Sequence, residues 1–345
     1  MPLQNDDLPG ISIILVLRNE EEYLARCLQS LVDSDYPSDK TEILLVDGMS
    51  TDRTAEIIDR WAKLDQRIRR LQNPGKIVST GMNLGLRESR FDLILWTSGH
   101  TLLRPDHLRK CLDMMRRTKA AAVGGVLETV AFSWIGKINA AVLSSSFGVG
   151  NAHHRIGGQS GWVPAVTMAL YRKESILAAG GFNESLPRSQ DNDLHNRMNQ
   201  IGARSYMDAG IRPTYLCRET FGGLLRQAWN NGYWNIMLTK MRSRGLNLRH
   251  FVPMAFILVL LLLAVAAVLR PQGSIALAGL VAIYLAADLV ASAFAGIRRS
   301  LLLQIPLLLL WFPALHVTYG VASWVALFSR IPAHRAKVRD TDPSS

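Results

Sequence analysis

Cysteine is scarce in this chain of 345 residues, which contains three cysteines and no CxxC pair. Such wide spacing excludes a disulfide framework and a cysteine-based zinc cluster. The first ten residues also lack the cationic and apolar regions of a secretory signal peptide. We therefore expect the N-terminal part of the chain to remain in the cytosol, which is a reducing compartment.

Charged residues are also few, at 19% of the chain, while 48% of the residues are hydrophobic. The charges are unbalanced, because 39 Lys and Arg against 28 Asp and Glu give a net charge of +11. A basic excess can indicate nucleic acid as a partner. Here the excess gathers beside long apolar stretches, where attraction to anionic lipid explains it, so we expect a membrane and no nucleic acid.

Three long stretches near the C-terminus carry almost no charge. Residues 251–269 are 19 uncharged residues and, as a helix, reach about 28 Å, the thickness of one hydrocarbon core. Residues 274–297 contain Asp288 as their single charge, and we expect these first two stretches to span the membrane. Residues 300–329 fit one tilted span, which we favour, or an interfacial segment followed by a span. Asp288 is either a functional group or, as we favour, an acid near the cytoplasmic end.

Basic residues at the borders of these stretches predict the topology. Lys240, Arg242, Arg244 and Arg249 precede the first stretch, and residues 237–250 contain no acid. By the positive-inside rule, the N-terminal domain lies on the cytoplasmic side of the inner membrane. The tail after residue 329 is basic as well, which conflicts with three spans, so the side on which it lies stays open.

The first hundred residues alternate between expected strands and helices. Residues 11–17, 43–46 and 93–96 are short apolar runs, typical of strands that are buried on both faces. Residues 23–32 and 54–64 place apolar side chains at helical spacing. This order predicts an α/β fold, in which ligands bind beyond the carboxyl ends of the strands.

The residues directly after these strands are polar and form a candidate binding site. They are residues 18–21 (RNEE), 47–52 (DGMSTD) and 97–100 (TSGH). An aspartate at a strand end, followed by glycine, can present its carboxylate to a nucleobase or a ribose. A plain turn carboxylate has the same pattern, so Asp47 alone leaves both interpretations open.

Longer motifs resemble the family 2 glycosyltransferases, which have the GT-A fold: residues 11–20 (ISIILVLRNE), 46–52 (VDGMSTD) and 180–184 (GGFNE). Shorter motifs resemble the ExoA-type succinoglycan branch, whose members end in membrane spans: residues 123–125 (VGG), 146–150 (SFGVG), 190–194 (QDNDL) and 226–227 (RQ). The resemblance covers about residues 10–235. It implies a Rossmann-like α/β domain of the GT-A fold, followed by transmembrane helices.

The resemblance also implies the substrates. In this family a nucleotide-diphosphate sugar, usually UDP-linked, binds at the strand ends with a divalent cation, and the anomeric centre is inverted. Carried over by motif, Leu17, Arg18, Glu20 and Asp47 hold the nucleoside. Lys76 would approach the base or the phosphates, although a solvated loop lysine fits the sequence equally well.

Residues 98–100 (SGH) fall where the family carries its DxD metal motif, which resembles Asp-Ala-His in the ExoA-type branch. The first aspartate is absent, and Ser98 stands in its place within the nucleotide-sugar site. Because Mn²⁺ and Mg²⁺ prefer carboxylate oxygen, a hydroxyl and an imidazole make a poorer site. We expect His100 to ligate Mn²⁺ or Mg²⁺, with phosphates supplying most other ligands; the alternative is an ordinary loop histidine.

Asp191 is the candidate catalytic residue. Apolar residues at helical spacing over 194–201 predict that a helix begins near residue 189, where the helix dipole alone favours acids. The family match gives Asp191 the position of the base that deprotonates the acceptor hydroxyl. It gives Asp193 a supporting place beside the acceptor and the diphosphate.

The segment before the membrane, residues 226–234 (RQAWNNGYW), resembles the family's Gln-Arg acceptor motif in a diverged form. Arginine can pair with a departing diphosphate, and aromatic rings pack on sugars. Arg226, Gln227 and Trp234 are therefore candidates for binding the acceptor and the diphosphate. Trp229 and Trp234 fit equally well as anchors at the membrane interface.

These expectations divide the chain into a GT-A catalytic domain (1–215), an interface and acceptor segment (216–250), a membrane domain of two to three helices (251–329) and a basic tail (330–345). The predicted function is the inverting transfer of a sugar, from UDP-glucose or a close relative, to a lipid-linked saccharide acceptor in surface polysaccharide biosynthesis. Two alternatives are a polyprenyl-phosphate glycosyltransferase and, given the altered DxD motif, a non-catalytic nucleotide-binding scaffold.

Overall fold

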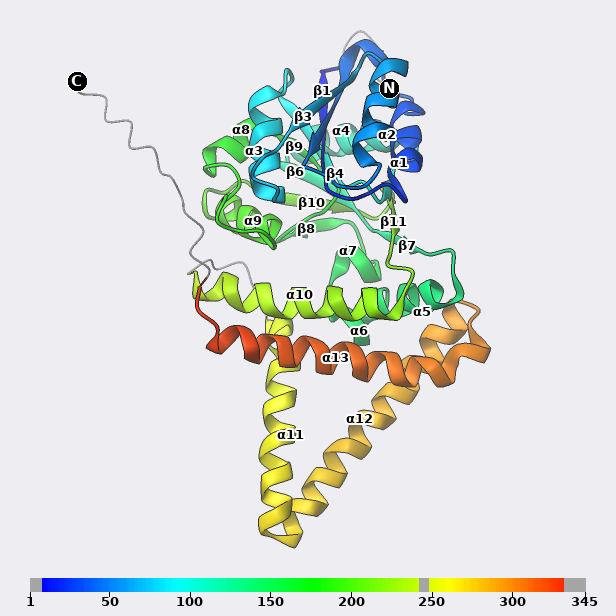
Figure 1. Cartoon of the computed structure of the whole chain (residues 1–345), viewed down its shortest axis with the longest axis vertical. Coiled ribbons are helices and arrows are strands. Elements are labelled where there is room, and N and C mark those ends of the chain that lie inside the picture. The colour runs from blue at the N-terminus through cyan, green and yellow to red at the C-terminus, as the bar shows by residue number, and fades with distance from the viewer. Residues whose placement is uncertain (1–7, 242–247, 332–345) are drawn as a thin grey trace, which may run out of the picture.

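The computed structural model describes residues 8–241 and 248–331. An eight-stranded sheet with the order β3-β2-β1-β4-β9-β6-β10-β8 forms the centre of the N-terminal part (Figure 1). Its strands are β1 (Ile11–Leu17), β2 (Thr41–Asp47), β3 (Ile68–Gln72), β4 (Leu93–Thr97), β6 (Ala122–Gly125), β8 (Gly161–Val163), β9 (Leu170–Arg172) and β10 (Ser205–Asp208). The sheet is parallel from β3 to β4, whereas β9 is antiparallel to both β4 and β6. Strand order reverses at β1, the position at which such sheets bind ligands.

Helices cover both faces of this sheet. One layer packs on the face that receives Ile11, Ile13 and Leu15, and consists of α1 (Leu24–Val32), α2 (Thr54–Leu64) and α4 (His107–Thr118). The other layer packs on the face that receives Ile14, and consists of α3 (Val78–Glu88), α8 (Lys173–Ala178) and α9 (Gln190–Gln200). The apolar run of β1 is therefore buried on both sides, as its sequence predicted.

A smaller sheet of order β5-β11-β7 lies between the large sheet and the C-terminal helices (Figure 1). Its strands are β5 (Thr101–Leu102), β7 (Glu128–Val130) and β11 (Thr214–Leu216). Three helices follow between β7 and β8 in the chain: α5 (Trp134–Leu143), α6 (Ser146–Val149) and α7 (His153–Ile156). In Figure 1, α7 lies near the small sheet, whereas α5 and α6 lie beside α10.

The C-terminal helices are α10 (Phe221–Lys240), α11 (Val252–Leu269), α12 (Pro271–Arg298) and α13 (Ile305–Phe328), and a short helical turn, η3 (Leu248–His250), precedes α11. Figure 1 shows α11 and α12 leaving the domain as a hairpin, whereas α13 runs beside α10 across the upper end of that hairpin. By length and composition, all three apolar stretches form helices that could cross a membrane. Asp288 is buried in α12 and accepts a hydrogen bond from Ser292 (3.1 Å).

Polar contacts fix α13 against α10. The Ser323 hydroxyl donates to the Gly232 carbonyl (3.2 Å), and a Cβ added at Gly232 would collide with the Tyr319 carbonyl. The Lys240 ammonium donates to the carbonyls of Ala326 (3.2 Å) and Leu327 (2.9 Å). The exposed side of α13 is a stripe of apolar side chains, namely Leu310, Val317, Val321, Val325 and Phe328. The helix therefore has one side packed on protein and one side suited to lipid.

Candidate active site

The loops after β1, β2 and β4 lie against one another at one edge of the large sheet. The Gly48 N–H donates to the Leu17 carbonyl (2.8 Å), and a Cβ at Gly48 would lie 3.3 Å from the Lys76 carbonyl. A Cβ at Gly99 would lie 3.2 Å from the Glu20 Cβ. The close contacts at Gly48 and Gly99 bring these loops together. The loops carry five residues that were singled out from the sequence: Leu17, Arg18, Glu20, Asp47 and Lys76. Their roles in binding a nucleoside stay predictions.

Asp47 is buried, and both of its carboxylate oxygens are engaged. Oδ1 accepts from the Ser50 N–H (3.0 Å), and Oδ2 accepts from Nη2 of Arg70 (2.8 Å). Arg70 belongs to β3, an edge strand that was not predicted from the sequence. The residues of β3 (IRRLQ) lack a period-two alternation, because Ile68 packs on one face of the sheet and Leu71 on the other.

His100 is held by a carboxylate. Its Nδ1 lies 3.2 Å from both Oε1 and Oε2 of Glu20, which can only accept, so Nδ1 carries the proton. In the neutral ring Nε2 then presents its lone pair, and it has no hydrogen-bond partner in residues 8–241 or 248–331. A carboxylate behind the imidazole is the usual arrangement around a metal-binding histidine. The pair therefore fits a cation that takes one ligand from the protein.

Ser98 is turned toward Thr101, since their hydroxyl oxygens lie 2.8 Å apart. Across the described part of the chain, no group of three or more His, Cys, Asp and Glu side chains is arranged to hold a metal. A cation at His100 would thus depend on ligands from a bound substrate.

The acid motif begins α9, as the sequence predicted. Asp191 is half-buried in its first turn, where Oδ1 accepts from the Asn192 N–H (2.9 Å). Burial raises the pKa of Asp191 above its ordinary value, although this hydrogen bond and the charge of Arg155 act in the opposite direction. A raised pKa makes its carboxylate a stronger base.

Asp193, two residues after Asp191, connects α9 to the loop at Gly180 and Gly181. It forms an ion pair with Arg197 (2.6 Å), whose guanidinium also donates to the carbonyls of Ala179 and Gly181. Gly180 and Gly181 have φ values of +83° and +70°, which suit glycine. The Gly-Gly motif and the acid motif are therefore one connected unit.

Tyr215 of β11 links the two halves of the site. Its ring meets the His100 ring edge to face (5.3 Å between centroids), and the Arg155 guanidinium lies 4.9 Å from the centre of the Tyr215 ring. Arg155 in turn acts electrostatically on Asp191. His100 and Asp191 thus lie on the same side of the domain. Neither Tyr215 nor Arg155 was singled out from the sequence, because both come from short elements without a periodic pattern.

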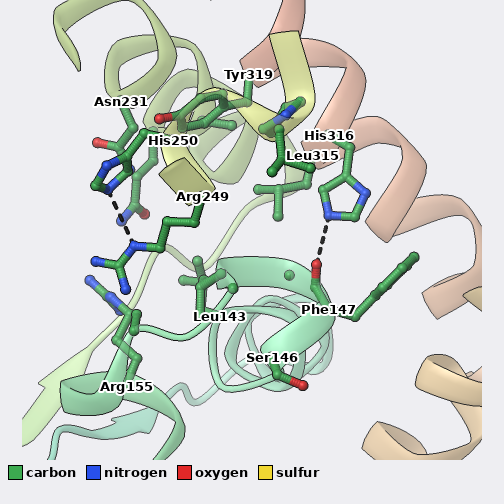
Figure 2. A pocket seen from close by; sticks show the side chains of 18 of the residues that line it. Leu143, Ser146, Phe147, Arg155, Asn231, Arg249, His250, Leu315, His316 and Tyr319 are labelled. Carbon is green, nitrogen blue, oxygen red and sulfur yellow. Dashed lines mark hydrogen bonds between the residues drawn. The ribbon is translucent and has the colours of Figure 1, made fainter. Parts of the chain in front are cut away.

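A cavity of about 460 Å³ lies between this region and the C-terminal helices (Figure 2). Gln227 lines it, whereas Arg226 is exposed and is not among its lining residues. Trp234 packs with Tyr233 (5.5 Å between ring centroids) and near Met237. The structure therefore places one of the three acceptor candidates in the cavity and the other two outside it.

Comparisons with known proteins agree with this architecture. The family described as Glycosyl transferase family 2 matches residues 12–177. The chain is 29% identical over 234 residues to the succinoglycan biosynthesis protein ExoA of Rhizobium meliloti, covering 67% of this chain and 71% of that protein. It is 24% identical over 330 residues, 90% of this chain and 95% of the relative, to a dolichyl N-acetyl-alpha-D-glucosaminyl phosphate 3-beta-D-2,3-diacetamido-2,3-dideoxy-beta-D-glucuronosyltransferase of Methanococcus voltae.

Among solved structures, the chain is similar to the mannosyltransferase PcManGT from Pyrobaculum calidifontis in complex with GDP-Man and Mn²⁺ (TM-score 0.57, 21% identity, covering 94% of this chain and 88% of that one). It is also similar to S. aureus TarS 1–349 in complex with UDP-GlcNAc (TM-score 0.50, 15% identity, 91% and 90% covered). The sheet order and the strand-end loops, with these likenesses, define a GT-A fold followed by apolar helices. The family match, the relatives and the similar structures together support a glycosyltransferase of family 2 that is similar to the ExoA-type branch.

Proposed function

We propose that this enzyme transfers one sugar from a nucleotide-diphosphate donor to a lipid-linked acceptor, with inversion at the anomeric carbon. The proposal rests on one observation. Three parts of the structure lie near Tyr215 and Arg155: the strand-end loops, the start of α9 and a cavity beside the apolar helices. UDP-glucose or a close relative is the proposed donor. The likeness to ExoA supports surface polysaccharide assembly as the setting.

The donor's nucleoside is assigned to the loops that hold Leu17, Arg18, Asp47 and Lys76. GDP-Man and UDP-GlcNAc in the two similar structures support a nucleotide sugar as the donor class. A divalent cation, Mn²⁺ or Mg²⁺, would be held by Nε2 of His100, with Glu20 fixing the ring. When bound, such a cation neutralises charge on a departing diphosphate.

Asp191 is assigned as the general base. Its carboxylate accepts the proton of the acceptor hydroxyl while that oxygen bonds to the anomeric carbon. The bond between the anomeric carbon and the phosphate oxygen breaks, and its electron pair leaves with the nucleoside diphosphate. The burial that raises the pKa of Asp191 favours this proton transfer.

A lipid phosphate is the second candidate acceptor, and the two arginines in the cavity favour it. A phosphate oxygen is already an anion and needs no base. Asp191→Asn therefore separates the two candidates.

The test measures sugar transfer to lipid extracts and donor binding by calorimetry in the same preparations. With a hydroxyl acceptor, Asp191→Asn should lower turnover by at least 100-fold, in line with the contribution of a general base, and leave donor affinity nearly unchanged. Asp113→Asn is the matched control, because Asp113 is an exposed acid on α4 paired with Arg117. Wild-type turnover in Asp191→Asn, with a defined hydroxyl acceptor, would remove Asp191 from the mechanism.

We also propose that the catalytic domain lies on the cytoplasmic side of the inner membrane. The basic residues before α11 support this side by the positive-inside rule. We place α11 and α12 across the membrane and α13 along its surface, because α13 packs along α10 and exposes an apolar stripe.

A further inference from the structure

The cavity beside the membrane helices has two chemically different ends. Figure 2 shows Arg155, Arg249, His250 and Asn231 on one side. The opposite end is lined by rings and aliphatic side chains, among them Phe147, Phe256, Tyr284 and Leu315. Its volume of about 460 Å³ falls in the range of about 300–1,000 Å³ that is typical of small-ligand sites. An occupant would need one charged end and one apolar end.

Two guanidinium groups dominate the polar end. Figure 2 shows the Arg155 and Arg249 side chains pointing toward one another, and Nη1 of Arg155 is buried without a hydrogen-bond partner in the described chain. Arg249 makes two long hydrogen bonds, to His250 (3.4 Å) and Asn151 (3.4 Å). No Asp or Glu is among the described residues that line the cavity. Two facing cations without a counter-charge are costly unless an anion joins them.

The backbone is shaped to allow this pairing. Gly150 has φ +63° and ψ −150°, a conformation that is essentially restricted to glycine. A Cβ at this position would lie 3.3 Å from the side chain of Arg249. Arginine forks match phosphate oxygens with two parallel hydrogen bonds, so a pair of them suits a phosphate or a diphosphate.

The residues at the apolar end of the cavity are held by hydrogen bonds and ring contacts, and this end lies beside the apolar helices. The Tyr284 hydroxyl donates to Nδ1 of His316 (2.8 Å), and Nε2 of His316 donates to the Phe147 carbonyl (2.8 Å). The Phe256 ring stacks on Tyr284 at 4.9 Å between centroids. These residues come from α6, α11, α12 and α13, so a chain leaving this end would enter the region of the apolar hairpin.

We propose that this cavity binds the phosphate or diphosphate of a polyprenyl-linked acceptor, with the anion between Arg155 and Arg249 and the first prenyl units against Phe256 and Tyr284. The proposal rests on the proposed function and names the part of the acceptor that the cavity holds. Oε1 of Gln227 is buried in the cavity wall without a donor in the described chain, and would accept from an acceptor hydroxyl. Because Arg155 also touches Tyr215, the anion would lie next to the donor half of the site.

The test uses the full-length protein in phosphatidylcholine nanodiscs, titrated with a short polyprenyl diphosphate. Arg155→Gln and Arg249→Gln should each raise the dissociation constant for the lipid at least tenfold, while the donor affinity of Arg249→Gln stays at the wild-type value. Arg60→Gln is the matched control, since Arg60 is exposed on α2 away from the cavity, and it should bind as wild type does. Arg249→Lys keeps the charge but loses the fork, so its loss should be smaller.

Unchanged lipid affinity in both glutamine variants would overturn the proposal. Inorganic pyrophosphate should bind at least tenfold more weakly than the lipid, and equal affinity would overturn the apolar half of the site. Full competition by phosphatidylglycerol would overturn specificity for the prenyl lipid. If the wild-type protein binds the lipid but transfers no sugar to it, the result counts against the proposed function alone. If Arg155→Gln and Arg249→Gln are active and keep the wild-type KM for the lipid, the result counts against this site alone.

Discussion

Replacing Glu20 with glutamine would remove the charge behind His100 and keep much of the geometry. Glutamine can still accept a hydrogen bond from Nδ1 through its amide oxygen. The backbone would remain in place, because the Glu20 N–H donates to Oγ1 of Thr54 (2.8 Å). Glu20→Gln therefore tests whether the carboxylate strengthens Nε2 as a ligand.

The size of the effect follows from the contact. Hydrogen bonds to charged groups contribute about 1.5–3 kcal/mol, and neutral ones about 0.5–1.5 kcal/mol. The difference, about 1–1.5 kcal/mol, corresponds to a roughly tenfold weaker cation site. Glu20→Ala removes orientation as well as charge, so it should reach the upper end of the 10- to 100-fold range for such partners, about 100-fold. The side chains of Glu20 and His100 are only 16% and 17% exposed, which limits solvent screening.

The assay is Mn²⁺ binding in the presence of donor, followed by electron paramagnetic resonance, together with Mn²⁺ activation of transfer. Glu21→Gln is the control, since Glu21 is 40% exposed and pairs with Arg53 on the surface, where ion pairs contribute little. Identical Mn²⁺ titrations for wild type and Glu20→Ala would refute the reasoning, because His100 could then not be the ligand that Glu20 supports.

Three further predictions follow from the geometry. Because the pKa of Asp191 is raised in the folded state, its ionised form disfavours folding. The stability that the protonated form retains at low pH is lost as the pH rises through the folded-state pKa. Asp191→Asn should therefore melt at a higher temperature than wild type at pH 7, by roughly 2–4 °C per kcal/mol, and the two proteins should melt at the same temperature near pH 3. Gly232→Ala should destabilise by about 1–3 kcal/mol through collision with the Tyr319 carbonyl, while Gly222→Ala on the same helix, with open space around it, should be neutral in thermal melts. Cysteines placed at Arg330 and Gln272 should react with an impermeant maleimide from opposite sides of the membrane, and labelling of both from one side would contradict the surface position of α13.

The sequence was informative where a residue's place is dictated by topology. Residues 11–17 and 54–64 match β1 and α2, because a continuous apolar run and a helical stripe each have one stable placement. The ends of parallel strands meet at one sheet edge, so Glu20, Asp47 and His100 could be grouped without a structure. The antiparallel insertion of β9 could not be foreseen, since it has three residues.

The second half of the site depended on contacts that no pattern encodes. Arg155 lies in a four-residue helix, and its partner ring, Tyr215, lies in a three-residue strand. Arg249 was noted from the sequence only as a basic residue before a span, whereas in the structure it lines the cavity next to Gly150, which is 99 positions away in the chain. Long-range pairs of this kind follow from packing and not from local periodicity.

The proposed surface position of α13 would also remove a conflict in the charge distribution. Phe221, near the start of α10, meets Trp311 at 4.3 Å, and Lys240 at its end donates to Ala326 and Leu327, so the two helices run side by side in the same direction. Both ends of α13 therefore lie at the level of α10. If α13 crossed the membrane, the basic tail would lie opposite Lys240, against the positive-inside rule. With α13 on the surface, Arg298, Arg299 and Arg330 share the side of the catalytic domain, and two spans satisfy the rule throughout the chain.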